Sequence, residues 1–177
     1  MIRMLALPLL RLSAILAPGA SATVLPTSLN LTAVWASKGE STLECWQIGP
    51  LQRSADPGTS GAPFMFLGEV VNTTFTVLPP GTDGGLHNAP SFQFVFFASG
   101  LAHVTLPHSK DEAWVRGGKN GLIIAADTAD VSSHGHRTEY PGGDNTVTLQ
   151  IPIKNPDEFK RLRLHSGPCT EAEISAV

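Results

Sequence analysis

The sequence predicts an all-β protein with a single domain, and three observations carry this prediction. Glycine (17) and proline (14) are plentiful among the 177 residues and are spread along the chain, as a turn-rich β protein requires. Short apolar runs alternate with turn signals about every 8 to 12 residues, which is typical of a sandwich or a barrel. The length suits one well-packed core and is too short for two comfortable domains.

Residues 1–22 have the pattern of a secretory signal peptide. Arg3 supplies the positive charge, residues 5–10 are apolar, and residues 20–22 form a small-x-small cleavage site. Arg11 interrupts the apolar run, so a buried strand or helix is the alternative. No other apolar run approaches the roughly 20 residues that span a bilayer. We therefore expect a secreted, extracellular protein that has no membrane association after cleavage.

Strands are expected along most of the remaining chain. An N-terminal arm and a first strand at residues 43–48 occupy residues 23–60, which end in a loop rich in Gly, Pro and Ser. Residues 61–155 form the main β-domain, in which the run 79–85 is the strongest turn signal. The expected strands of this domain are residues 64–72, 74–78, 86–98, 101–106, 112–116, 121–126, 135–140 and 145–153.

The clearest strand signal lies at residues 145–153. Four aliphatic residues, Val147, Leu149, Ile151 and Ile153, alternate there with polar residues and one proline. A period of two is the signature of a strand with one buried face.

Residues 156–177 are expected to form a short helix and a tail. Asn155 suits the N-cap, Pro156 the first helical position, and Glu158 follows the cap by three residues. These signals predict a helix that ends near Leu164.

Two further features agree with export. Asn30 and Asn72 each begin an Asn-x-Thr triplet and are candidate glycan acceptors. The two cysteines, Cys45 and Cys169, are expected to pair in an oxidising compartment, with two buried free thiols as the alternative. A bridge closing so long a loop would stabilise the fold by roughly 4 kcal/mol in the chain-entropy model.

Charge excludes one class of partner. The formal net charge is −3 and no long basic stripe exists, which argues against binding to nucleic acid. The one basic cluster, Lys160, Arg161 and Arg163, lies beside Asp157 and Glu158 and reads as a solvated face.

The stretch from residue 79 to residue 100 carries the most informative pattern. A Gly-rich turn precedes His87, Gln93 follows, and six residues later comes Gly100. This stretch resembles the first conserved motif of the cupin superfamily, which has a Gly-containing turn, His-x-His, Glu, six residues and Gly. His87 matches the first His and Gln93 the Glu, whereas Ala89 stands in place of the second His.

A second stretch is similar to the other cupin motif. Residues 121–127 match its first strand, and its single His is best matched by His136, with His134 as the alternative. The loop between is longer than in the family, and the usual Pro-x-Gly is absent. The resemblance covers residues 64–153 and extends to small secreted cupin-like proteins of filamentous fungi. It implies a cupin-type jelly roll, or double-stranded β-helix barrel, over residues 61–155.

Side chains two residues apart share one face of a strand. On the expected strand 86–98, one face therefore changes from polar to apolar, as suits a barrel with a wet mouth and a packed base. The other face carries Phe92, Phe94 and Phe96, which fit an aromatic core, a contact with the N-terminal arm or a homodimer contact. The first face consists of His87, Ala89, Ser91, Gln93, Val95 and Phe97, of which Ala89 and Ser91 are expected to line the pocket.

The resemblance implies a metal site in altered form. Metal-binding cupins hold a divalent ion with three His and one Glu, and this chain departs from that set at Ala89 and Gln93. His87, His136 and Gln93 could still hold Mn, Fe, Ni, Cu or Zn with water completing the shell, and His134 could restore a third imidazole. Alternatively, the cluster is a metal-free pocket that hydrogen-bonds a small organic ligand.

Three hypotheses about function follow. The first is a metal-dependent enzyme of the oxygenase or isomerase type acting on a small organic molecule. The second is a non-catalytic secreted or wall-associated protein that binds a sugar or an aromatic compound. The third is a metal-free isomerase or cyclase that uses His87 and His136 as acid and base. Asp127, Glu139 and Asp144 are further candidates for acid or base groups, although each lies near a turn.

Overall fold

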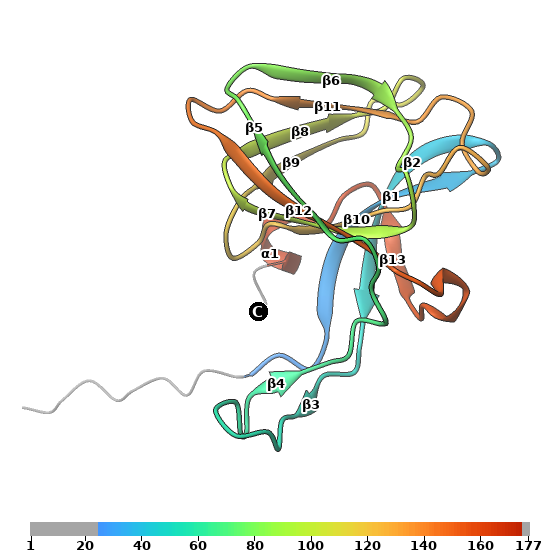
Figure 1. Ribbon diagram of the computed structural model, residues 1–177. Helices are drawn as coiled ribbons and strands as arrows, with labels where there is room; N and C mark the ends of the chain where they lie inside the picture. Colours follow the sequence, from blue (N-terminus) through green and yellow to red (C-terminus); the bar gives the residue numbers. More distant parts are fainter. Residues whose placement is uncertain (1–24, 175–177) are drawn as a thin grey trace, which may run out of the picture.

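The computed structural model describes residues 25–174, and the predicted signal peptide at residues 1–22 lies outside them. Within the described part the regular secondary structure is almost entirely β-strand, as predicted (Figure 1). Two large sheets face each other, and a small two-stranded ribbon projects from one end (Figure 1). None of the helices in residues 25–174 is long and apolar enough to cross a membrane.

The main domain is a jelly roll. Its strands pair first with last, β5 with β12, β6 with β11, β7 with β10 and β8 with β9, all antiparallel. This is the pattern of one long hairpin rolled up on itself. The strands are β5 (Thr74–Leu78), β6 (Thr82–His87), β7 (Gln93–Ser99), β8 (Leu101–Thr105), β9 (Glu112–Arg116), β10 (Leu122–Ala125), β11 (His136–Tyr140) and β12 (Thr146–Pro152).

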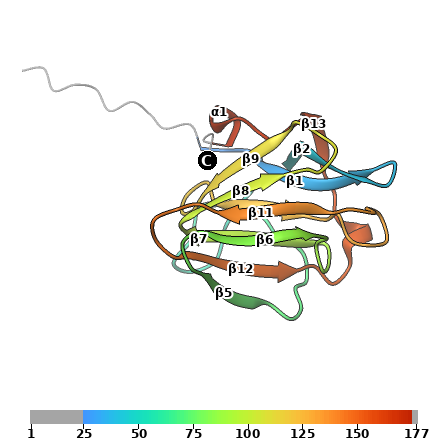
Figure 2. The ribbon, with the colours of Figure 1, turned by 90° about the horizontal axis from the view of Figure 1, so that it is seen from above.

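The rolled hairpin forms two facing layers rather than a closed barrel. One sheet contains the order β10-β7-β12-β5 and the other the order β6-β11-β8-β9. Among the described residues no strand ladder joins the two sheets, so the expectation of a closed barrel is corrected to an open sandwich. Figure 2 shows the strands of the two layers running nearly alongside one another.

Three strands outside the jelly roll widen the first sheet. β1 (Leu29–Ser37), β2 (Glu40–Ile48) and β13 (Leu162–Ser166) extend it in the order β13-β2-β1-β10, with β1 parallel to β10. Residues 29–37 were expected to be part of a polar arm, and this is wrong. β1 is buried on both faces for most of its length, so it lacks the alternation that reveals a half-buried strand.

Two other expected elements are also corrected. The predicted strand at residues 64–72 is reduced to β4 (Pro63–Phe64), which pairs with β3 (Gln52–Arg53), and to an isolated bridge farther along. Phe66 is 77% exposed whereas Met65 and Leu67 pack against the core, so one face of the segment is covered although few of its residues pair with another strand. The predicted helix after Asn155 is a single 3-10 turn, because the Asn155 side chain makes no cap hydrogen bond and the chain then extends into β13. The short C-terminal helix is α1 (Glu171–Ile174).

The aromatic residues around β7 belong to the core of the same chain. Phe94 is 1% exposed and packs edge-on against Phe159 with ring centroids 5.7 Å apart. Phe92 stacks on Trp46 and also contacts Phe159. Of the alternatives left open by the sequence, the aromatic core accounts for Phe92 and Phe94.

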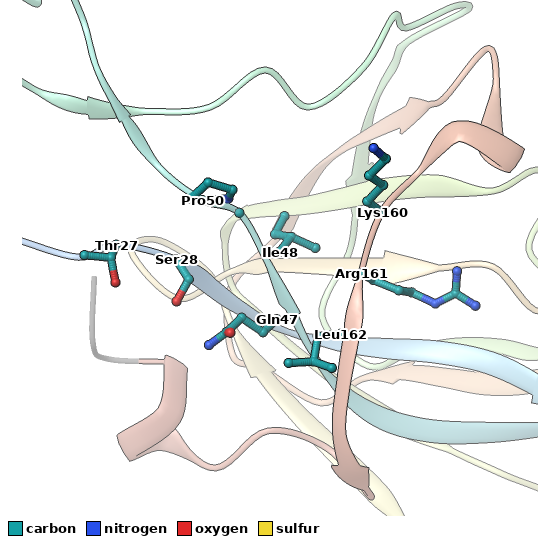
Figure 3. Close-up of a pocket in the computed structure, with 9 residues that line it drawn as sticks. Thr27, Ser28, Gln47, Ile48, Pro50, Lys160, Arg161 and Leu162 are labelled. Carbon is teal, nitrogen blue, oxygen red and sulfur yellow. The ribbon is translucent and has the colours of Figure 1, made fainter.

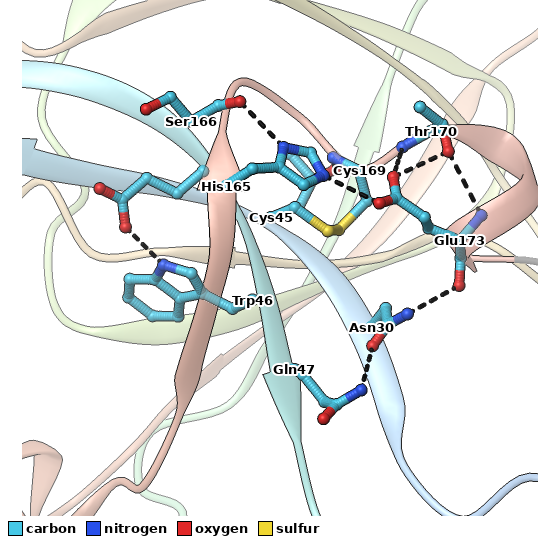
Figure 4. The surroundings of a disulfide bond; sticks show 11 residues. Asn30, Cys45, Trp46, Gln47, His165, Ser166, Cys169, Thr170 and Glu173 are labelled. Atoms are coloured by element: carbon cyan, nitrogen blue, oxygen red, sulfur yellow. Dashed lines mark hydrogen bonds and ion pairs between the residues drawn. A yellow bond between two sulfur atoms is a disulfide. The ribbon is translucent and has the colours of Figure 1, made fainter.

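The predicted disulfide is confirmed. Cys45 on β2 and Cys169 in the tail are bonded across 124 residues of sequence. Both cysteines are buried, and α1 lies directly beyond the bridge (Figure 4). The bond therefore fastens the C-terminal tail to the strands that precede the jelly roll.

The turn between β7 and β8 gives a test of close packing. Gly100 has φ 86°, and a Cβ there would lie 2.6 Å from the Thr146 Cα. Gly58 has nearly the same φ, 88°, with open space around it. Both substitutions to Ala incur left-handed strain, but Gly100→Ala must also displace β12. We expect Gly100→Ala to lower the free energy of unfolding by about 1–3 kcal/mol more than Gly58→Ala, measured by urea denaturation; equal effects would contradict the packing.

The anchoring of the tail should depend on pH. The hydrogen bond to the Ser166 carbonyl, together with that to Glu173, raises the pKa of His165 above 6.5. Hydrogen bonds from Thr170 and His165 lower the pKa of Glu173 from 4.5 to about 2. The His165 contribution is full below pH 6.5 and is lost as the pH rises through its folded pKa. The Glu173 contribution is full above pH 4.5 and is lost as the pH falls toward 2.

Amide protection of residues 165–174 is therefore expected to be greatest between about pH 4.5 and 6.5. Hydrogen exchange, corrected for its intrinsic pH dependence, measures this protection. In the control variant His165→Gln the decline above pH 6.5 should disappear. Protection that rises steadily through pH 8 in the parent would contradict the assignment.

Candidate functional site

The two histidines of the cupin-like motifs meet between neighbouring strands. His87 ends β6, His136 begins β11, and the two residues are direct partners in the antiparallel register. Their ring centroids are 4.5 Å apart. His136 is 5% exposed, whereas His87 is exposed on the open side. The structure thus brings together two imidazoles that are far apart in the sequence.

Gln93 reaches the same place from the facing sheet. The sequence predicts one continuous strand that contains both His87 and Gln93, and this prediction is wrong. The expected turn at 79–85 is largely strand β6, and the chain leaves strand geometry at residues 88–92, where Pro90 cannot donate to a ladder. It then crosses to the other sheet and begins β7 at Gln93. His87 and Gln93 therefore approach one another from opposite layers.

These residues line a small cavity inside the sandwich. Its volume is about 80 Å³, and His87, Gln93 and His136 line it together with Ala89, as expected for a pocket-lining residue. The deeper walls are apolar and come from both sheets: Val95, Phe97, Val104, Ile123 and Ala125.

A larger groove adjoins this cavity. It has a volume of about 650 Å³ and shares His87, Pro90, Gln93 and Gln150 with the cavity. Ser91 lines the groove rather than the cavity. The remaining lining is mostly polar or small and includes Asn72, Thr74, Thr76, Pro152 and Lys154.

A fully buried carboxylate holds the ring of His136. Asp127, 0% exposed, accepts a hydrogen bond at Oδ2 from His136 Nδ1 (2.8 Å) and another from Ser41 Oγ (2.6 Å). The Ser41 hydroxyl is in turn 2.8 Å from that of Ser132. Because a carboxylate can only accept, Nδ1 of His136 is the donor, and in the neutral ring Nε2 then keeps its lone pair.

A backbone carbonyl fixes the ring of His87 in the same tautomer. His87 Nδ1 lies 2.9 Å from the Gly85 carbonyl oxygen, which can only accept a hydrogen bond. In the neutral ring, Nε2 of His87 therefore also keeps its lone pair. In addition, Oε1 of Gln93 is buried and has no hydrogen-bond partner among residues 25–174. Three acceptor groups thus line one small cavity.

Tyr140 adds a group that stays protonated. It lines the cavity from the opposite end of β11 to His136, and burial raises its pKa above the ordinary value of 10. The phenol is therefore a hydroxyl at neutral pH.

His134 does not join the cavity, which corrects its role as an alternative or third imidazole there. Its Nδ1 lies 3.3 Å from Oε2 of Glu40, and its ring is 4.6 Å from that of His108. Gly135 explains the separation: its φ of 69° breaks the strand alternation, and a Cβ there would meet the His87 carbonyl oxygen at 2.2 Å. The chain turns at this glycine, so His134 and His136 lie in different surroundings.

The candidate acids from the sequence also lie in different surroundings. Asp127, considered only as an acid or base near a turn, is the partner of His136. Its place directly after the apolar strand of residues 121–126 was the one sequence signal for it. Glu139 lies beside Arg137 and His103, and Asp144 is exposed in a loop.

The two glycan triplets have different surroundings. Asn30 lies on β1, and its Nδ2, the atom a glycan would modify, donates to the Glu173 carbonyl (3.1 Å). A glycan would replace one of the two Nδ2 hydrogens beside this contact, and modification of Asn30 stays a prediction. Asn72 is exposed at the rim of the groove, and its modification stays a prediction.

A further hollow of about 430 Å³ lies where β1 begins and β2 ends (Figure 3). Gln47, Leu162 and Lys160 line it, and Arg161 points away toward Trp35 and Trp46. Among its described lining residues there is no His, Cys, Asp or Glu. This hollow therefore lacks the acid, base and metal-ligating groups of the histidine cavity.

Comparison of the sequence with protein-family models finds no match, and comparison with curated proteins finds no similar sequence. The site is therefore interpreted from its own geometry.

The buried carboxylate offers a stability test. Asp127→Ala leaves the Nδ1 hydrogen of His136 and the Ser41 hydroxyl without their acceptor, so we expect a loss on the order of 3 kcal/mol in the free energy of unfolding. Asp130→Ala, in the exposed part of the same loop, is the matched control and should change it by less than about 0.5 kcal/mol. Chemical denaturation measures both, and similar values for the two variants would contradict the assigned role.

Proposed function

We propose that the chain is a secreted cupin-type protein whose cavity binds a divalent transition-metal ion through His87, His136 and Gln93. We propose further that it is an enzyme acting on a small organic molecule in the adjoining groove. The observation that carries the proposal is that Nδ1 of each histidine faces a fixed hydrogen-bond acceptor, so that in the neutral rings both Nε2 lone pairs are left for a ligand.

Metal ligation explains this arrangement well. Histidine ligands almost always donate their other ring N–H to a carboxylate or a backbone carbonyl, as His136 and His87 do. Three acceptor groups line the same small space, and a cation would interact favourably with all three. Two imidazoles and an amide oxygen suit Mn, Fe, Ni, Cu or Zn, with water in the remaining positions.

The groove supports a small organic substrate. Its volume of about 650 Å³ falls in the usual range for sites that bind small molecules. Thr74, Thr76 and Gln150 present neutral polar groups along it, and both threonine hydroxyls donate to Gln150 Oε1. Such a lining suits an uncharged or weakly charged molecule that carries hydroxyl or carbonyl groups.

The residues around the cavity would have different roles in the reaction. A bound ion supplies a Lewis acid that polarises a substrate oxygen. Asp127 holds the His136 ring in position, and the Tyr140 hydroxyl can donate a hydrogen bond. The apolar wall formed by Val95, Phe97 and Ile123 excludes water from the inner side.

The proposals of family and export rest on separate supports. The jelly-roll pairing and the positions of His87, Gln93 and His136 in the motifs support a cupin. The disulfide between Cys45 and Cys169 supports passage through an oxidising compartment, in agreement with the signal-like N-terminus.

One observation favours the metal-free alternative. The cavity has no carboxylate available as a ligand: Gln93 is neutral, and Asp127 is turned toward His136 and Ser41. The same three acceptors could then receive hydroxyl groups of a bound sugar or a related molecule. This reading gives a non-catalytic binding protein.

Substitutions at Gln93 distinguish the proposed metal site from the metal-free binding pocket. Gln93→Glu adds the missing negative charge with little change of shape, and Gln93→Leu removes the oxygen. We expect Gln93→Glu to raise Mn²⁺ or Zn²⁺ affinity at least about tenfold and Gln93→Leu to lower it. Titration calorimetry measures both, in a His108→Ala/His134→Ala background that removes the surface histidines.

Elemental analysis of the parent, purified without chelator or affinity metal, completes this test. Bound metal that is lost in His87→Ala would support the metal site. No metal on analysis, together with none taken up on titration, would end the metalloenzyme proposal and leave the binding protein.

A further inference from the structure

A second group of potential metal ligands lies on the surface, outside the cavity. It consists of Glu40, His108 and His134, whose ligand atoms all lie within 4.8 Å of one another. Oε2 of Glu40 is 2.9 Å from His108 Nδ1 and 3.3 Å from His134 Nδ1. The two imidazole rings meet edge to face.

The start of β2 and two loops supply these ligands, and a hydrogen bond fixes the β1–β2 turn to one of the loops. Glu40 follows the two-residue turn between β1 and β2, in which Lys38 and Gly39 have φ of 55° and 82°. Gly39 accepts a hydrogen bond from the Ser133 N–H (2.9 Å) and forms a bridge with Ser132. The carboxylate of Glu40 is therefore held next to His134 by backbone contacts, independently of any ligand.

His108 approaches from the loop between β8 and β9. It is the third donor, and all three side chains are about half exposed: 56% for His108, 48% for His134 and 42% for Glu40. An ion can thus enter from solvent, and water can complete its coordination.

We propose that Glu40, His108 and His134 form a second, surface site for a divalent transition-metal ion, with Zn²⁺ as the best-suited ion. Two histidines and one glutamate are an established donor set for Zn²⁺ with one open position. Ligand bonds of about 2.0–2.1 Å in a tetrahedral site place neighbouring ligand atoms about 3.3 Å apart. The Glu40 contacts of 2.9 and 3.3 Å are already close to this spacing.

An ion at this site would join three segments that are otherwise connected mainly through the strands. One of them runs from β10 to β11 and carries Asp127 near its start and His136 at its end. Because the ion binds the folded arrangement and not the unfolded chain, Zn²⁺ should raise the unfolding temperature of the protein.

Zn²⁺ titration of the full chain tests the proposal. The His108→Ala/His134→Ala variant should lose the surface site, with Zn²⁺ affinity there lowered at least about 100-fold, because removing two ligands costs more than removing an outer-shell partner. His103→Ala is the matched control, since His103 also lies 2.9 Å from a glutamate, Glu112, but has no second imidazole nearby. It should bind Zn²⁺ like the parent.

A cavity variant separates this proposal from the previous one. His87→Ala should keep the surface site and its Zn²⁺-dependent rise in unfolding temperature. Adding His108→Ala and His134→Ala to His87→Ala should abolish that rise, and without metal this triple variant should unfold like His87→Ala, because His108 and His134 are exposed. Unchanged Zn²⁺ binding in that variant, or no Zn²⁺ binding in folded His87→Ala, would overturn the surface site whatever the result at the cavity.

Discussion

The antiparallel register between β6 and β11 determines what the interior of this molecule can do. It places His87 directly opposite His136, and the two rings share the mouth of the sandwich. A slip of one residue would turn one of these side chains to the other face of the sheet. Gly135 secures the register, because its backbone lies against the His87 carbonyl where any larger residue would collide. The chemistry of both histidines therefore depends on one pairing and on one glycine.

The strands added at the N-terminus contribute to this site as well as to the sheet. Ser41, on β2, donates to the carboxylate of Asp127, which in turn holds His136. A residue outside the jelly roll thus supports a ring inside it. The same hairpin carries Glu40, which contacts the surface histidine His134. Two neighbouring residues at the start of β2 therefore contact the two sites: Ser41 supports the cavity and Glu40 belongs to the proposed zinc site.

Particular residues explain how far the sequence could predict this structure. The alternation in residues 146–152 revealed β12, although the most deeply buried side chains are the threonines Thr146 and Thr148 and not the aliphatic residues between them. β1 was missed, because a strand covered on both faces has no such alternation. The cupin-like motifs named His87, Gln93 and His136, and the structure brings them together, although by a crossing between sheets and not along one strand. The position of His134 depends on the left-handed conformation of Gly135. The contact between Asp127 and His136 depends on how the loop between them folds back. Neither can be predicted from sequence spacing alone.

The last strand of the chain has a consequence for biosynthesis. β13 pairs with β2, so the wide sheet that the first strands begin is completed only by residues 162–166. A ribosome must therefore have made the chain through residue 166 before this edge can close, and Cys169 meets Cys45 later still. Contacts over such sequence distances form slowly. Until then the unfinished molecule would expose the edge of β2, and a chaperone that covers strand edges could bind there.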